Sequence, residues 1–332
     1  MTICVFGAGS IGCYVGGRLA AAGADVVLVG RERLRAEVAR HGLTLTDWRG
    51  GELRVADPRY QTAPEAAVDA ELVLVTVKSA ATAEAADVLA GVLKPDAVVV
   101  SFQNGLRNTE LLAERLPGRT VLPGMVGFNV VNQGAGRFHA GTEGELEVRR
   151  HPALAKYAER FAEAGLPLTE HADMAPVQWA KLLLNLNNAV NALSGLPLKR
   201  QLSQRPYRRC LALAQAEALR LLDAAGVRPA KLTPLPPQWI PTLLGLPDRI
   251  FARAAGRMLA IDPLARSSMW EDLQAGRATE VDFLNGEVVA LAERWGLPAP
   301  VNAKLVTLVR DAEAGGRRDW TGAELYAALT RP

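Results

Sequence analysis

The fold of this 332-residue chain is decided near its start by the stretch Ile3-Cys4-Val5-Phe6-Gly7-Ala8-Gly9-Ser10-Ile11-Gly12. An apolar run that predicts a strand leads into a glycine-spaced turn, and a helical pattern follows. Such a unit presents backbone N–H groups and the positive end of a helix dipole to a pyrophosphate. The first glycine allows the tight turn, the second lets phosphates approach, and the third lets the helix pack on the strand. The residues predicted to bind a dinucleotide cofactor are Gly7, Ala8, Gly9, Ser10, Ile11 and Gly12, called the glycine turn below.

A second apolar run, residues 26–29, ends shortly before Arg31, and Arg33 and Arg35 follow. A carboxylate at this place binds a free ribose 2′-hydroxyl and repels a 2′-phosphate. A guanidinium fork suits a phosphate instead, so Arg31 predicts NADPH. The alternative is an ordinary surface arginine. An N-terminal signal peptide is not favoured, because no basic stretch precedes the apolar run and glycines interrupt it.

The composition is that of an ordinary protein with two domains. The chain is longer than one core usually supports, and its net charge of +3 is spread without a basic block. Nucleic acid is therefore not an expected partner, and no apolar run is long enough to predict a membrane span. Three distant cysteines indicate buried thiols in a reducing cytoplasm. Four histidines without ligand spacing predict no metal site.

The first half of the chain predicts an α/β domain of Rossmann type with a mainly parallel sheet, residues 1–172. Apolar runs at 72–77, 97–101 and 120–122 fit strands that helices cover on both faces. The glycine-rich, alternating segment 124–148 predicts an antiparallel edge that closes the sheet.

The second half, residues 173–332, predicts an all-helical domain for substrate binding and dimerisation. One long helix is expected from Asp173 to about Gly195, and others at 207–225, 267–275, 280–295 and 303–314. Thr279 with Asp282, and Thr321 with Glu324, have capping-box spacing. Five prolines between 234 and 247 predict extended chain, as a lid, a subunit contact in a homodimer, or a packed loop.

A polar stripe marks the first helix of this domain. Lys181, Asn185 and Asn188 follow the i, i+4, i+7 spacing in a segment that is otherwise mostly leucine and alanine. Solvent-facing helices favour glutamate, lysine and glutamine over repeated asparagine, so an active-site cleft between the domains explains the stripe better than a solvated face. There Lys181 could donate a proton to a carbonyl as hydride arrives, while amides hold the substrate. Glu280 is a weaker candidate, since a first-turn acid is common at any helix start.

Several motifs together resemble the 2-dehydropantoate 2-reductase (ketopantoate reductase) family over nearly the whole chain. They are the glycine turn, Arg31, Thr76-Val77-Lys78, Gln103-Asn104-Gly105, Trp179-Ala180-Lys181, and Ser267-Ser268-Met269 with Thr279-Glu280. The resemblance implies a cytoplasmic, NADPH-dependent reduction of 2-dehydropantoate to (R)-pantoate on the route to pantothenate and coenzyme A.

The resemblance also implies roles for single residues. Lys181 is expected to be the general acid, and Glu280 to orient the lysine or the ribose on the cofactor side. Lys78 and Asn104 are expected to line the phosphate and nicotinamide side. The expected substrate-binding residues are Lys181, Asn185, Asn188, Asn191, Ser268 and Asn104.

One position departs from the family pattern. Members usually carry a second asparagine eight residues after the lysine, where this chain has Ala189 between Asn188 and Asn191. Either the helix is locally shifted or the contact has moved. The substrate is therefore left open between ketopantoate and another 2-oxo acid or an imine. An NADPH-binding sensor without catalysis is the alternative from another class.

Overall fold

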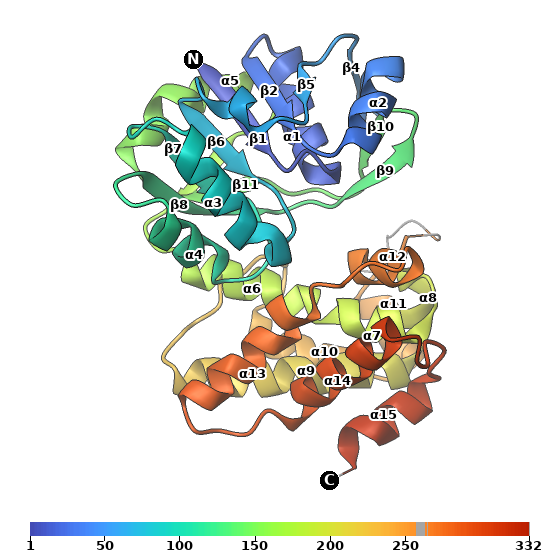
Figure 1. The fold of residues 1–332 in the computed structure, drawn as a ribbon. Helices are drawn as coiled ribbons and strands as arrows, with labels where there is room; N and C mark the ends of the chain where they lie inside the picture. Colours follow the sequence, from blue (N-terminus) through green and yellow to red (C-terminus); the bar gives the residue numbers. More distant parts are fainter. Residues whose placement is uncertain (257–262, 264, 332) are drawn as a thin grey trace. The chain divides into compact units, whose positions relative to one another are not determined.

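The structure is a computed structural model that describes residues 1–256, 263 and 265–331. It consists of two compact units, Met1–Met174 and Ala175–Pro332 (Figure 1). Unit 1 is built from strands and helices, whereas the described residues of unit 2 form helices, turns and loops. The predicted fold class, a Rossmann-type α/β domain followed by an all-helical domain, is confirmed.

The main sheet of unit 1 has eight strands in the order β12-β11-β8-β7-β6-β1-β2-β5. Their bounds are β1 (Thr2–Phe6), β2 (Asp25–Val29), β5 (Tyr60–Gln61), β6 (Leu72–Val75), β7 (Val98–Ser101), β8 (Thr120–Val126), β11 (Leu146–Arg149) and β12 (Leu168–His171). The strands from β5 to β8 in this order pair in parallel. Since β1 is buried on both faces, its apolar run needs no polar alternation.

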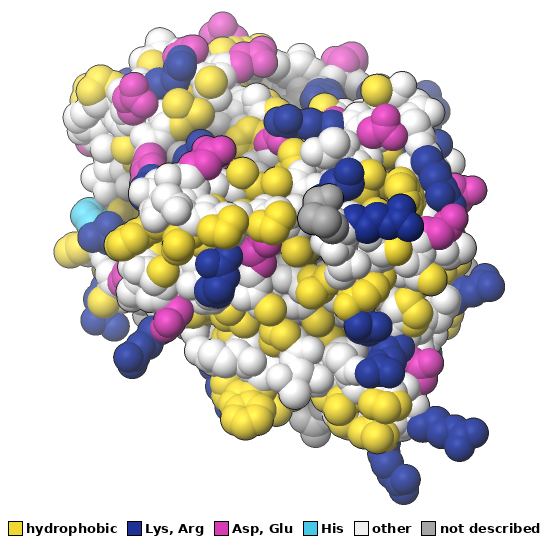
Figure 2. All heavy atoms as spheres, turned by 90° about the horizontal axis from the view of Figure 1, so that it is seen from below, with side chains coloured by type: hydrophobic (Ala, Val, Ile, Leu, Met, Phe, Trp, Pro, Cys, Tyr) yellow, Lys and Arg dark blue, Asp and Glu magenta, His cyan; other side chains and the backbone are white. Residues whose placement is uncertain are grey.

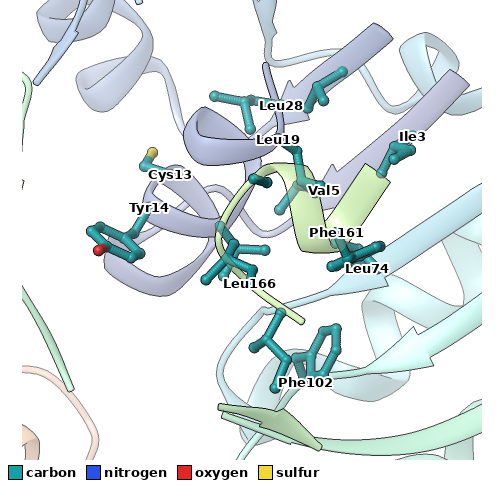
Figure 3. Close-up of a cluster of buried hydrophobic side chains, with 14 of the residues drawn as sticks. Ile3, Val5, Cys13, Tyr14, Leu19, Leu28, Leu74, Phe102, Phe161 and Leu166 are labelled. Carbon is teal, nitrogen blue, oxygen red and sulfur yellow. The ribbon is translucent and has the colours of Figure 1, made fainter. Parts of the chain in front are cut away.

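Helices cover both faces of this sheet. Alternate residues of β1 enter different hydrophobic clusters, Ile3 and Val5 in one and Cys4 in the other. The first cluster includes side chains of α1 (Ser10–Ala21) and α5 (Ala155–Glu163), as Figure 3 shows for part of it. The second includes side chains of α3 (Thr82–Val92) and α4 (Asn108–Arg115). The sheet is therefore the middle layer of a three-layer unit.

The predicted antiparallel edge is correct for β11, which pairs antiparallel with β8. The outermost strand on that side is β12, which pairs in parallel with β11. The expectation that the whole segment 124–148 closes the sheet was wrong. Its middle forms β9 (Val130–Gly134) and β10 (Arg137–Ala140), which join β3 (Leu43–Asp47) and β4 (Glu52–Val55) in a separate sheet. Phe138 and Leu45 are buried there in the hydrophobic cluster that also contains side chains of α1, so the small sheet packs against that helix.

The main sheet reverses its strand order at β1. The chain leaves β1 for β2 on one side and later returns to β6 on the other side. Ligands of open α/β sheets bind outside the carboxyl ends of the strands at such a reversal. The glycine turn follows β1, Arg31 follows β2, Lys78 follows β6 and Asn104 follows β7.

Unit 2 packs around one long central helix, α9 (Arg205–Ala224), which contacts α7, α8, α10, α13, α14 and α15. The other helices are α6 (Ala175–Asn185), α7 (Asn187–Ser194), α8 (Leu198–Leu202), α10 (Ile240–Leu244), α11 (Asp248–Ala254), α12 (Ser268–Gln274), α13 (Asn285–Arg294), α14 (Pro300–Glu313) and α15 (Gly322–Thr330). The buried carboxylate of Glu217 on α9 accepts the backbone N–H groups of Val301 and Asn302 at 3.0 and 2.9 Å. It thereby satisfies donors at the N-terminus of α14.

The proline-rich segment is not extended throughout, contrary to the prediction. A one-turn 3-10 helix (Pro237–Trp239) leads into α10, and Pro237 and Pro241 stand in the first turns of these helices. Proline is tolerated there, because the N–H group it lacks would have no partner inside the helix.

Two predicted helix signals had different outcomes. Thr321 and Glu324 form the expected capping box at the start of α15. Thr279 and Asp282 do not form one. The Thr279 hydroxyl accepts the Val281 N–H at 3.2 Å, and Asp282 pairs with Arg310. A one-turn 3-10 helix (Val281–Phe283) then precedes α13, so the expected helix 280–295 is interrupted.

Charged side chains are dispersed over one face of the molecule. On the face drawn in Figure 2, lysine and arginine side chains alternate with acidic and apolar ones and do not gather in one block. Within the described part of the chain, no helix is both long and apolar enough to cross a membrane.

Candidate active site

The glycine turn has the geometry that a pyrophosphate needs. Gly7 has a φ of +104°, and a Cβ there would lie 2.4 Å from the Val77 nitrogen. A Cβ at Gly12 would lie 2.7 Å from the Gly7 oxygen. Gly9 differs, because its Cβ would meet only the Gly7 oxygen at 3.9 Å. The first and third glycines are thus required by packing, whereas the second keeps open the space beside the N-terminus of α1.

Two polar side chains to which the sequence analysis gave no role support this turn. The Thr76 hydroxyl donates to the Gly7 oxygen at 2.8 Å. The Tyr60 hydroxyl donates to the Ala8 oxygen at 3.0 Å, and burial raises the pKa of Tyr60. A Cβ at Gly30 would lie 2.2 Å from that hydroxyl, so Gly30 makes room for Tyr60. Neither contact has a signal in the local sequence, because each joins residues more than fifty positions apart.

Arg31 is exposed two residues after β2, at the N-cap of α2 (Glu32–His41). The nearby Arg35 is bound by both carboxylate oxygens of Glu32 at 2.7 and 2.6 Å. Within the described ranges, neither Arg31 nor Arg33 forms an ion pair with a carboxylate. Arg31 can therefore take a phosphate without first breaking a salt bridge, and the residues present fit a dinucleotide with a 2′-phosphate.

Two more of the predicted cofactor residues lie at neighbouring strand ends. Lys78 is exposed three residues after β6, and Asn104 is half-buried three residues after β7. β6 and β7 are paired neighbours, so both residues belong to the same edge of the sheet. Gly105 has a φ of +86° and turns the chain away directly after Asn104.

The predicted polar face in unit 2 exists, although its helix is divided. α6 ends at Asn185 and α7 begins at Asn187, so the single helix expected from Asp173 to Gly195 was wrong in this respect. The half-buried positions across the division are Lys181, Leu184, Asn185 and Asn188, while the residues between them are buried. This is the i, i+3, i+4, i+7 spacing of one helix face, because Leu186 keeps helical dihedral angles.

Ala189 lies off this face. It is fully buried, whereas Asn188 next to it is half-buried with Lys181 and Asn185. Asn188, and not Ala189, therefore shares the half-buried face with Lys181 and Asn185.

Asn191 does not fit the role predicted for it. Its side chain is fully buried. The Nδ2 donates to the Leu196 oxygen at 2.9 Å, and the Oδ1 accepts the Ser267 N–H at 2.9 Å. An amide with both ends bound inside the unit braces α7 against the start of α12 and cannot reach a substrate, so this prediction is corrected.

Ser267 and Ser268 divide two tasks between them. The Ser267 hydroxyl donates to the Asn188 oxygen at 3.3 Å and accepts the Trp270 N–H at 3.2 Å as the N-cap of α12. Ser268 is exposed at the first position of α12. The cap therefore holds Ser268 close to α7, which carries Asn188.

Glu280 is half-buried at the N-cap of the 3-10 helix Val281–Phe283, and not in the first turn of α13 as expected. The residue before it is fixed from outside the turn, because Glu313 accepts the Thr279 N–H at 2.7 Å. The helix dipole argument for Glu280 is accordingly weaker than the sequence indicated.

Among the described residues, no group of three histidine, cysteine or acidic side chains could hold a metal ion. The cysteines Cys4, Cys13 and Cys210 are free and buried.

Comparison with known proteins gives consistent matches. The model of the family described as ketopantoate reductase PanE/ApbA matches residues 3–153, and its C-terminal model matches residues 173–313. A 2-dehydropantoate 2-reductase of Halobacterium salinarum is 32% identical over 95% of this chain and all of its own length.

Solved structures agree in fold. A PanE/ApbA family ketopantoate reductase from Ralstonia eutropha superposes with a TM-score of 0.81 at 30% identity, over 95% of this chain and 99% of its own. A D-mandelate dehydrogenase with NADH and anilino(oxo)acetate has a TM-score of 0.79 at 18% identity, over 95% and 99%. A dimeric ketopantoate reductase from Staphylococcus aureus has a TM-score of 0.71 at 15% identity, over 95% and 99%. The last two likenesses show the fold alone. The chain is thus an oxidoreductase, and it belongs to the ketopantoate reductase PanE/ApbA family.

Proposed function

We propose that this protein reduces 2-dehydropantoate to (R)-pantoate with NADPH, in the biosynthesis of pantothenate and coenzyme A. The observation that carries the proposal is the half-buried face of Lys181, Asn185 and Asn188 on α6 and α7. In a member of this family, such a face offers one proton donor and two amides to an oxo acid.

We propose NADPH as the cofactor because the glycine turn leaves open space at Gly9, and because Arg31 is exposed without a carboxylate partner among the described residues. When bound, NADPH supplies the hydride that adds to C2 of the substrate. The residues that would hold it are the glycine turn, Arg31, Lys78, Asn104 and Glu280. Residues 1–172 then act as the cofactor domain, and residues 173–332 as the substrate domain.

The carbonyl oxygen gains a proton as C2 gains hydride, and Lys181 is the proposed donor. Glu280 is proposed to orient the lysine or the cofactor ribose. Asn185, Asn188 and Ser268 are proposed to bind the substrate's hydroxyl and carboxylate, with Asn104 on the nicotinamide side. Asn191 is not retained as a substrate ligand, since its amide is bound within unit 2.

A related 2-oxo acid or an imine is the second candidate for the substrate, and Ala189 is the observation that favours it. Family members usually carry an asparagine at this position, and the buried methyl group of Ala189 cannot supply its amide. A non-catalytic sensor is not retained, because the family is one of oxidoreductases.

Two further properties are proposed with the function. A cytoplasmic location suits three buried free thiols. A homodimer is proposed by analogy with the dimeric relative, and Trp239 at 65% exposure offers an apolar surface near α10 for such a contact.

A substrate panel tests the proposal. Purified protein is mixed with NADPH and, in separate reactions, with ketopantoate, other 2-oxo acids and cyclic imines, and the loss of NADPH absorbance is followed. We expect kcat/KM to be highest for ketopantoate. A higher kcat/KM for another oxo acid or an imine would make that compound the substrate in place of ketopantoate. Binding of NADPH without turnover of any compound in the panel would refute the proposal.

A further inference from the structure

A cluster of buried polar side chains in unit 1 has no part in the roles assigned so far. Ser79, Thr82, Ser101, Gln103 and Asn108 are between 0% and 8% exposed. They lie where β6 and β7 end and where α3 and α4 begin. Hydroxyls and amides are costly to bury unless their hydrogen bonds are made, so the pattern of those bonds indicates what the cluster does.

The first half of the cluster runs from β7 to α3. The Ser101 hydroxyl donates to Gln103 Oε1 at 3.0 Å. Gln103 Nε2 donates to Thr82 Oγ1 at 2.7 Å and to the Val77 oxygen at 3.1 Å. The Thr82 hydroxyl in turn donates to Asn108 Oδ1 at 2.8 Å. Thr82 therefore links the two amides, accepting from one and donating to the other.

The second half runs from α4 back to the loop after β7. Asn108 Nδ2 donates to Ser79 Oγ at 3.1 Å and to the Asn104 oxygen at 2.6 Å. The Ser79 hydroxyl donates to the same Asn104 oxygen at 2.9 Å. The Asn104 carbonyl thus accepts two hydrogen bonds and closes the chain of donors.

The chain of hydrogen bonds has one direction. It begins at the Ser101 hydroxyl and passes through Gln103, Thr82, Asn108 and Ser79 to the Asn104 carbonyl, and the Thr82 and Ser79 hydroxyls within it both accept and donate. Flipping either amide would place two donors or two acceptors against each other, so the chain permits a single arrangement. Hydrogen bonds aligned in series at low dielectric also strengthen one another.

The acceptors of this chain adjoin the predicted cofactor residues. The Val77 carbonyl directly precedes Lys78, and the Asn104 carbonyl belongs to Asn104 itself. The chain therefore ties the loop after β6 to the loop after β7. A side chain that depends on it keeps its direction only while every link is present.

We infer that Thr82 and Asn108 are positioning residues, which act through the chain from Ser101 to Asn104 to hold Lys78 and Asn104 in the geometry for hydride transfer. The inference rests on the proposed function for the roles of Lys78 and Asn104. Neither Thr82 nor Asn108 is a catalytic residue, since both are buried and act through other groups.

The test compares Thr82→Val with Thr82→Ser. Valine keeps the shape of threonine and removes the hydroxyl, whereas serine keeps the hydroxyl and removes the methyl group. Amide hydrogen exchange is measured in segments 76–82 and 102–108 of the full chain. We expect exchange in both segments to rise on the order of tenfold in Thr82→Val and to stay near wild type in Thr82→Ser.

Turnover is measured on the same proteins. In Thr82→Val we expect kcat to fall on the order of tenfold or more, because small displacements of positioning groups are costly. The Kd for NADPH should change less than about threefold, since the glycine turn is untouched. The isotope effect on kcat with 4-deuterated NADPH should rise as hydride transfer becomes slower. Thr82→Ser should resemble wild type in all three.

A second variant covers the case in which Thr82→Val does not fold. Asn108→Asp keeps the acceptor for Thr82 and loses both donated bonds. Its control is Asn132→Asp, the same change in β9, where the side chain accepts from the Gly134 N–H at 2.8 Å. We expect faster exchange and lower kcat for Asn108→Asp alone.

The outcomes separate this inference from the proposed function. Unchanged exchange in Thr82→Val, or equal losses in Thr82→Val and Thr82→Ser, would overturn the inference. Faster exchange with an unchanged kcat and isotope effect would overturn it as well. If wild type reduces no oxo acid or imine, the proposed function fails, while the exchange data still decide whether the chain holds the two loops.

Discussion

Lys181 is the single side chain on which the proposed chemistry depends most. It lies on the half-buried face of α6, where it can meet a substrate without full desolvation of its ammonium group. We predict that Lys181→Ala lowers kcat on the order of 100-fold or more, because general acid catalysis contributes about that much. Lys199→Ala, at an exposed position of α8, is the control and should leave kcat unchanged. An equal kcat in both variants would remove Lys181 from the role.

Arg31 carries the choice between the two nicotinamide cofactors. We predict that Arg31→Asp raises the Kd for NADPH much more than the Kd for NADH, because the carboxylate repels a 2′-phosphate and accepts a 2′-hydroxyl. Fluorescence titration with both cofactors measures the two constants. Arg40→Asp, the same charge change near the other end of α2, should affect neither strongly. Equal losses for both cofactors in Arg31→Asp would contradict the phosphate assignment.

In the turn between β1 and α1, we expect one glycine to matter for the stability of unit 1 and another to matter for the binding of NADPH. We predict that Gly9→Ala leaves the melting temperature near wild type, since its Cβ would meet only one atom, at 3.9 Å. The methyl group would occupy the space proposed for phosphate, so the Kd for NADPH should rise about tenfold or more. Gly7→Ala should instead unfold the unit, because its Cβ would lie 2.4 Å from the Val77 nitrogen at a φ of +104°. Calorimetry and NADPH titration of both variants distinguish the two effects.

The N-terminus of α15 gives a pH-dependent contribution to stability. Hydrogen bonds from Thr321 and Arg317 lower the pKa of Glu324 from its usual 4.5 to about 2. A lowered pKa in the folded state means that the stabilisation is present above pH 4.5 and is lost as the pH falls toward 2. We predict that Glu324→Gln lowers the melting temperature at pH 7 and that the difference from wild type shrinks below about pH 4.5. Glu293→Gln, the same loss of one carboxylate at an exposed position of α13, is the control variant.

At the scale of the whole molecule, contiguous patterns were predictable and distant pairings were not. The parallel strands and the positions of the glycine turn and Arg31 could be predicted, because a short run of neighbouring residues defines each of them. The second sheet was missed, because β3 finds its partner β10 more than ninety residues later. Asn191 was misassigned for the same reason. Its amide type suggested a ligand, while the partners that bind it, at Leu196 and Ser267, become neighbours only in the fold.

The support of the candidate site was equally invisible in the sequence. Thr82 and Asn108 stand in helix starts, where polar residues are ordinary, and nothing local shows that their side chains meet. Tyr60 lies on a two-residue strand that is distant in sequence from the glycine turn, although its hydroxyl contacts that turn in the fold. Candidate ligand-binding residues can be predicted from their type and spacing in one sequence. The residues that support them become neighbours only in the folded chain, so the sequence does not indicate them.

The three buried thiols allow local unfolding of the protein to be measured by alkylation. Cys4, Cys13 and Cys210 are each 0% exposed, and burial raises the pKa of Cys4 and Cys210 to about 12. An alkylating reagent needs an accessible thiolate, so the native chain should resist it at neutral pH. Two of these thiols belong to unit 1 and one to unit 2. Opening of unit 1 therefore adds two adducts to the mass, and opening of unit 2 adds one. NADPH should slow the alkylation of the two thiols in unit 1 and leave the alkylation rate of the thiol in unit 2 unchanged.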